Sequence, residues 1–154
     1  MSKMFRHIGI VVANLQESLD IYQNFLGLEL KAFVERNAGP HVDIMTGMPN
    51  SALKVAIMRC EDNNRIELIE YLNHTGVKRS PVLPHDIGAS HFALTVEDID
   101  MLYEKSKNFP VKWVSPPQLM PDGGVKMAYA ILNDECMVEL VQVFNPKATY
   151  SGGA

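Results

Sequence analysis

The stretch Phe5-Arg6-His7-Ile8-Gly9-Ile10-Val11-Val12 decides the fold, because a similar stretch occurs a second time in the chain. Its aliphatic residues Ile8, Ile10 and Val12 alternate with His7 and Gly9. This alternation predicts a strand with one aliphatic face and an opposite face that carries the imidazole.

A helix is predicted directly after this strand. Asn14 is a favourable N-cap, and Glu17 three residues on completes a pattern like a capping box. An apolar stripe then recurs at helical spacing and can cover the aliphatic face of the strand, at Leu15, Leu19, Tyr22 and Leu26. Gly27 suits the end of this helix.

The second half of the chain repeats this order. His91 lies 84 residues after His7, and the same offset places Asp98, another good N-cap, on Asn14. The segments expected to be the last strand of each half also match, Ile66-Glu67-Leu68-Ile69-Glu70 against Val138-Glu139-Leu140-Val141-Gln142. Because each half reads as β-α-β-β-β, we predict an α+β fold built from two tandem modules.

The 154 residues are expected to form one domain with an internal boundary. Module 1 covers about residues 4–72, a linker rich in Gly and Pro about 73–88, and module 2 about 89–144. Residues 145–154 are expected to be a flexible tail. Residues 36–51 also contain Gly and Pro, and we interpret them as a long loop with room for one helical turn, a candidate lid or binding loop.

Bulk composition excludes several classes of protein. The net charge is −4 and no run of Lys or Arg occurs, so we expect no nucleic-acid partner. No apolar run approaches the roughly 18 residues of a membrane span, and the N-terminus lacks the apolar core of a signal peptide. We therefore expect a cytoplasmic protein without a membrane partner, and buried, unpaired thiols at Cys60 and Cys136.

Two glutamates stand out because aliphatic residues flank them on both sides. Glu67 and Glu139 would each place a carboxylate in the centre of an apolar strand, which is costly unless a partner compensates it. If their strands face the two histidine strands, then His7, Glu67, His91 and Glu139 converge as a two-nitrogen, two-oxygen set for a divalent metal ion. Zn, Ni, Co, Mn and Fe(II) all accept such ligands. Glu70 is expected simply to face solvent.

These motifs, with Phe25-Leu26-Gly27-Leu28 between them, give the chain a resemblance to the vicinal oxygen chelate superfamily, the group of glyoxalases, bleomycin resistance proteins and extradiol dioxygenases. The resemblance spans about residues 5–144 and is that of a glyoxalase-like single-chain member. It implies two βαβββ modules whose mixed sheets curve around a metal-binding cleft, with His7, Glu67, His91 and Glu139 as ligands. It also implies a homodimer.

The function that this resemblance implies is a metal-dependent lyase or isomerase acting on a small-molecule substrate. A metal-side glutamate removes a proton next to a chelated carbonyl in such proteins, and Glu139 matches that residue, with Glu67 as the alternate. An Fe(II) extradiol-type dioxygenase is an alternative, although it uses two histidines and only one carboxylate. A non-catalytic protein that sequesters a drug or metabolite is the third possibility, with Met45, Met48, Met58, Tyr71, Trp113 and Tyr129 available to line a cleft.

Overall fold

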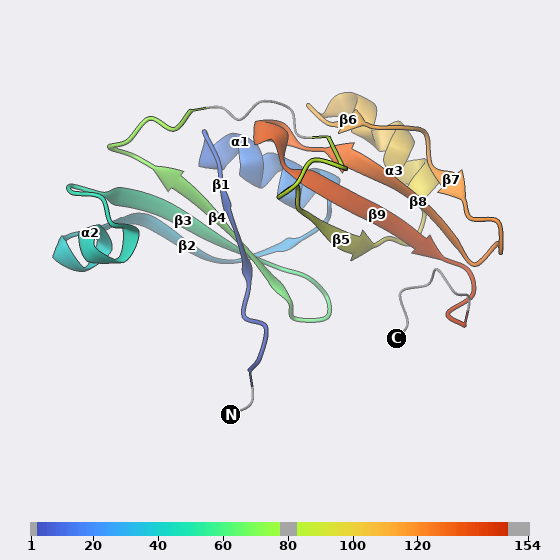
Figure 1. Ribbon diagram of the computed structural model, residues 1–154, viewed down its shortest axis with the longest axis horizontal. Coiled ribbons are helices and arrows are strands. Elements are labelled where there is room, and N and C mark those ends of the chain that lie inside the picture. The colour runs from blue at the N-terminus through green and yellow to red at the C-terminus, as the bar shows by residue number, and fades with distance from the viewer. Residues whose placement is uncertain (1–2, 78–82, 148–154) are drawn as a thin grey trace. The chain divides into compact units, whose positions relative to one another are not determined.

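The computed structural model describes residues 3–77 and 83–147, which belong to two compact units divided between residues 78 and 79 (Figure 1). Parts of the predicted linker (78–82) and of the predicted tail (148–154) lie outside the described residues. The elements of the first unit are β1 (Ile8–Val11), α1 (Leu15–Asp20), a π-helical turn (Ile21–Phe25), β2 (Glu29–Ala38), α2 (Pro40–Thr46), β3 (Ala52–Arg59) and β4 (Arg65–Tyr71).

The first unit is a four-stranded mixed sheet in the order β1-β4-β3-β2. β1 runs parallel to β4, whereas β3 is antiparallel to both of its neighbours. α1 contacts β3 and β4. Residues of α1 and of alternate strand positions are buried together in the core, among them Val12, Leu15, Leu19, Ile66 and Leu68. The predicted alternation of β1 is confirmed, since Val12 is buried and Val11 is exposed.

The second unit repeats this arrangement. Its elements are β5 (His91–Thr95), α3 (Ile99–Lys105), a 3-10 turn (Ser106–Asn108), β6 (Lys112–Trp113), β7 (Gln118–Leu119), β8 (Val125–Ile131), a second 3-10 turn (Asn133–Glu135) and β9 (Met137–Val143). The sheet order is β5-β9-β8-β6, and β7 also pairs with β8. β5 runs parallel to β9, as β1 does to β4. The predicted α+β class, with two βαβββ modules in chain order, is confirmed.

The predicted helix starts are confirmed by matching caps. Asn14 accepts hydrogen bonds from the backbone N–H groups of Gln16 and Glu17, and Asp98 accepts them from Asp100 and Met101. The first helix differs from the prediction in one respect, because its regular α-helical part ends at Asp20 and continues as the π-helical turn. Leu15, Leu19 and Tyr22 of the predicted apolar stripe are buried, but in the π-helical turn the buried residue is Phe25 instead of the predicted Leu26, which is half-buried.

The expectation that Glu70 only faces solvent is wrong. Its Oε2 accepts a hydrogen bond of 2.8 Å from the backbone N–H of Leu15, the first residue of α1. Gln142 does the same in the second unit, where its Oε1 accepts from the backbone N–H of Ile99 at 3.1 Å. Each last strand therefore satisfies one of the open N–H groups at the start of the helix in its own unit.

Residues 36–51 are more ordered than the predicted loop. β2 continues to Ala38, and α2 then fills much of the segment next to β2 and β3 (Figure 1). Gly39 and Gly47 flank α2 with positive φ angles of 123° and 70°, which glycine adopts without strain. Asp43 fixes the segment by accepting from the backbone N–H groups of Asn50 and Ser51.

Cys60 and Cys136 are both thiols outside any disulfide, and both are half-buried rather than buried. Burial, and to a smaller extent the nearby charge of Asp62, raises the pKa of the Cys60 thiol. Among the described residues, no helix is long and apolar enough to cross a membrane.

Replacing Glu70 tests the capping between β4 and α1. Glu70→Ala removes the acceptor of the Leu15 N–H and is expected to lower the free energy of unfolding by about 1 kcal/mol, a typical cost for a lost cap. Glu70→Gln keeps an acceptor and should stay within about 0.5 kcal/mol of the parent protein. Urea unfolding followed by circular dichroism measures both variants, and equal losses in the two would contradict the capping role.

Candidate metal centre

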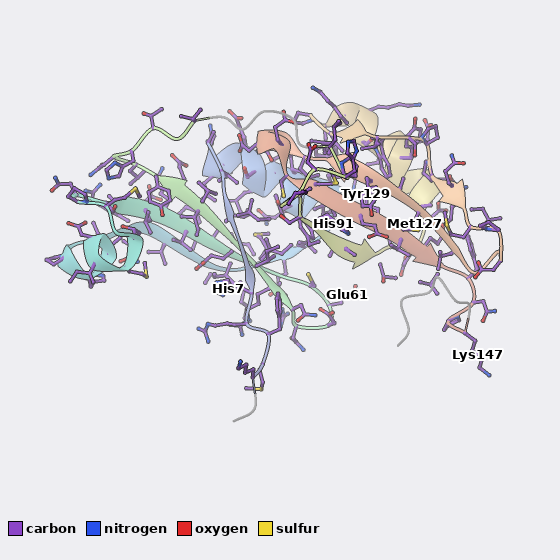
Figure 2. The ribbon with its side chains drawn as sticks, in the orientation of Figure 1. His7, Glu61, His91, Met127, Tyr129 and Lys147 are labelled. Carbon is purple, nitrogen blue, oxygen red and sulfur yellow. The ribbon has the colours of Figure 1, made fainter. Side chains whose placement is uncertain are left out.

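The first candidate ligand pair lies within the first unit. His7, which is labelled in Figure 2, immediately precedes β1, and Glu67 occupies the middle of β4. The imidazole Nε2 of His7 lies 3.2 Å from Oε2 of Glu67. The side chains are 32% and 24% exposed, so both are accessible from solvent but partly desolvated.

The pleat of the sheet explains why Glu67 faces His7. Ile66 and Leu68 are buried on the helix side of β4, which directs Glu67 to the opposite face. Gly9 lies beside Glu67 in the parallel register, and a Cβ built on Gly9 would lie 3.9 Å from Oε2 of Glu67. Glycine therefore leaves the space next to the carboxylate open.

The second pair repeats this geometry within the second unit. His91 begins β5 and Glu139 lies in the middle of β9, with His91 Nε2 3.1 Å from Glu139 Oε2. Val138 and Leu140 are fully buried on the other face. The residue beside Glu139 in the parallel register is Ala93, which is again small. Glu139 is 16% exposed, less than Glu67, so its carboxylate is the more desolvated of the two.

The second pair has an aromatic neighbour that the sequence did not single out as part of the site. The Tyr129 ring contacts the His91 ring edge to face, with ring centroids 5.0 Å apart and planes at 70° (Figure 2). Tyr129 lies across from Glu139 in the β8–β9 register. Burial, and secondarily the charge of Glu139, raises the pKa of the Tyr129 hydroxyl. A phenol in this position is therefore neutral at pH 7 and keeps its proton.

The donor chemistry of both pairs suits a divalent transition metal. Imidazole nitrogen and carboxylate oxygen are ligands of Zn, Ni, Co, Mn and Fe(II). Two ligands that each lie about 2.1 Å from an ion and at right angles to one another are roughly 3 Å apart, close to the separation in both pairs. Without a metal, the imidazole next to each carboxylate partly compensates its position among apolar neighbours.

The structure brings the four predicted ligands together as two pairs, each within its own unit. In residues 3–77 and 83–147, no group of three or more His, Cys, Asp or Glu side chains is close enough to hold a metal ion. That both pairs bind one common ion therefore stays a prediction.

The remaining histidines belong to neither pair. His41 contacts the side-chain oxygen of Asn37, His74 contacts the backbone oxygen of Pro49, and His85 is exposed. A pocket of about 340 Å³ in the first unit involves none of the four predicted ligands and is lined by Arg36, Ala38, Gly39, Pro40, Asp43, Asn50, Ser51 and Asn73.

Proteins of known sequence or structure resemble the chain over nearly its whole length. A Bacillus subtilis protein, the uncharacterized protein YwbC, is 25% identical over 144 residues, which cover 92% of this chain and 99% of YwbC. The crystal structure of a glyoxalase family protein from Bacillus cereus matches with a TM-score of 0.80 at 21% identity, covering 92% of this chain and 96% of that one. The fosfomycin resistance protein FosX from Listeria monocytogenes, in complex with Mn(II) and sulfate, matches with a TM-score of 0.60 at 17% identity and covers 92% and 93% of the two chains.

These structural likenesses show the fold. The model of one protein family matches residues 5–142, which include both His–Glu pairs. The chain therefore belongs to the glyoxalase/bleomycin resistance protein/dioxygenase superfamily.

Proposed function

We propose that the protein is a divalent-metal-dependent lyase or isomerase of the glyoxalase and epimerase type. It would act on a small molecule with a carbonyl group next to an acidic C–H bond. The observation that carries this proposal is the repetition of the His–Glu contact, at 3.2 Å in the first unit and 3.1 Å in the second. A single contact of this kind needs no ligand to explain it, but two at matching places in a repeat are best explained by a shared ligand.

His7, Glu67, His91 and Glu139 would hold the ion together, within one chain or between two copies. Two neutral imidazoles and two carboxylates balance the charge of a divalent cation, so the set can be partly buried at low cost. When bound, the ion supplies Lewis acidity toward the oxygen atoms of the substrate. A fold neighbour with bound Mn(II) supports a metal of this kind without identifying the one used here.

Glu139 is our candidate for the general base. Its carboxylate takes the proton from the carbon next to the carbonyl, the C–H bond breaks, and the electron pair moves toward the carbonyl. Returning the proton to another face or to a neighbouring carbon completes an isomerisation. Glu139 is the more buried of the two glutamates, so its carboxylate is better shielded from bulk water than that of Glu67. Glu67 is the alternate.

The paired geometry favours this function over the alternatives. An extradiol-type dioxygenase uses two histidines and one carboxylate, whereas both units here place a carboxylate against a histidine. A protein that only sequesters a drug or metabolite has no need of two half-buried carboxylates, which cost desolvation energy. We also propose a homodimer in the cytoplasm, with no nucleic-acid or membrane partner.

Metal titration of chelator-treated protein tests whether the four residues share one ion. We expect one ion for every two His–Glu pairs. Each single ligand variant should lower the metal affinity by about 100-fold or more, because losing even an outer partner of a metal ligand lowers it by about 10- to 100-fold. These variants are His7→Ala, Glu67→Gln, His91→Ala and Glu139→Gln. Isothermal calorimetry with Zn, Ni, Co, Mn and Fe(II) measures this.

His41→Ala is the matched control for removing a histidine and should leave the affinity unchanged, because His41 lies outside both pairs. Two ions per chain would contradict the shared site. So would a His7→Ala variant that still binds one ion with full affinity through the other pair.

Exchange of the substrate proton tests the role of Glu139. At saturating metal, Glu139→Gln should slow deuterium incorporation next to the carbonyl of α-hydroxy thioesters or hemithioacetals by about 10²- to 10⁴-fold, the usual contribution of a general base. Proton NMR in D₂O follows this exchange.

Glu70→Gln is the control, because Glu70 is a half-buried glutamate on the same strand as Glu67. Its side chain accepts a hydrogen bond from the start of α1 and does not belong to the candidate site. A fully active Glu139→Gln variant would refute the assignment. Loss of exchange in Glu67→Gln alone would move the role of base to Glu67.

A further inference from the structure

The two units differ in the size and chemistry of a side chain that touches the candidate site. Tyr129 lies across from Glu139 in the β8–β9 register, and the residue in the same relation to Glu67 is Ile57 in the β3–β4 register. The repeat therefore places an aromatic ring beside one glutamate and an aliphatic side chain beside the other.

The Tyr129 side chain connects three neighbouring strands of the second unit, β8, β9 and β5. β9 lies between β5 and β8, so Tyr129 must reach across the central strand to contact His91 on β5. Neighbouring strands are about 4.8 Å apart, which makes this span too long for most aliphatic side chains. Figure 2 shows His91 and Tyr129 next to one another in the second unit.

The contact between the rings of Tyr129 and His91 limits a rotation of the imidazole that the contact with Glu139 does not limit. The contact with Glu139 fixes the position of Nε2 of His91, but the ring can still turn about the line through that contact. An edge-to-face neighbour at 5.0 Å defines the tilt of the imidazole plane as well. An imidazole whose position and tilt are both fixed beforehand loses less conformational entropy when the ion binds.

We infer that Tyr129 is a positioning residue that pre-orders His91, so that the second pair is the organised half of the site and the first pair completes it. This inference rests on the proposed function for its metal-binding consequence. The ordering of the imidazole itself is a property of the metal-free protein and is tested separately.

Exchanging the two residues between the units tests the inference. Tyr129→Ile gives the second unit the residue of the first, Ile57→Tyr does the reverse, and Tyr129→Phe keeps the ring without the hydroxyl. NMR of the metal-free proteins reports the ring-current shift of the His91 C–H resonances and their nuclear Overhauser contacts to the ring at position 129. Calorimetry with Zn or Mn alone reports affinity.

We expect Tyr129→Ile to abolish the ring-current shift and the contacts, and to weaken metal binding about 10-fold, the lower end of the loss for an outer partner of a ligand. Tyr129→Phe should keep the contacts and bind within about 2-fold of the parent protein. Ile57→Tyr should leave the His91 resonances unchanged. Thermal unfolding of the metal-free variants separates these effects from a general loss of stability.

Unchanged His91 resonances in Tyr129→Ile would overturn the inference, as would equal losses of affinity in the Phe and Ile variants. If the parent protein binds no metal, the proposed function fails, while the NMR comparison still decides whether Tyr129 orders His91. If the parent binds metal and Tyr129→Ile binds it equally well, the inference fails and the proposed function stands.

Discussion

A carboxylate in the middle of an apolar strand needs a polar partner to offset its desolvation cost. The strand order of each unit supplies a histidine as that partner. Glu67 and Glu139 have buried aliphatic neighbours along their strands and meet a histidine from the adjacent parallel strand. Parallel pairing of the first and last strands is what brings the two side chains to one face of the sheet. The helix after the first strand carries the chain to the far side of the sheet, and the strands that follow lead back until the last strand pairs with the first. The helix packs against the face opposite the His–Glu pair.

The repeat conserves two kinds of feature for two different reasons. The helix caps at Asn14 and Asp98, and the long-range acceptors Glu70 and Gln142, hold each helix on its sheet. The His–Glu pairs serve no such purpose, because they lie on the face away from the helix. The difference between Tyr129 and Ile57 lies next to these pairs, where a difference in chemistry between the units would arise.

The sequence predicted the strands, the helix caps and the two His–Glu pairs because each depends on alternation or on a motif of a few residues. It did not predict the capping role of Glu70, whose partner Leu15 is 55 residues away and is brought close only by strand pairing. The helix α2 was predicted only as one helical turn within a long loop, because a seven-residue helix between glycines resembles a loop in composition. Tyr129 was only one of several aromatic residues until the β8–β9 register placed it across from Glu139.

The central claim is that two equivalent His–Glu pairs bind one metal ion. Anomalous diffraction from crystals grown with Mn or Zn, measured at the absorption edge of that metal, tests it most directly. We expect one anomalous peak within coordination distance of Nε2 of His7 and His91 and of a carboxylate oxygen of Glu67 and Glu139, from one chain or from two copies. A separate peak at each pair, or a peak at other side chains only, would contradict it.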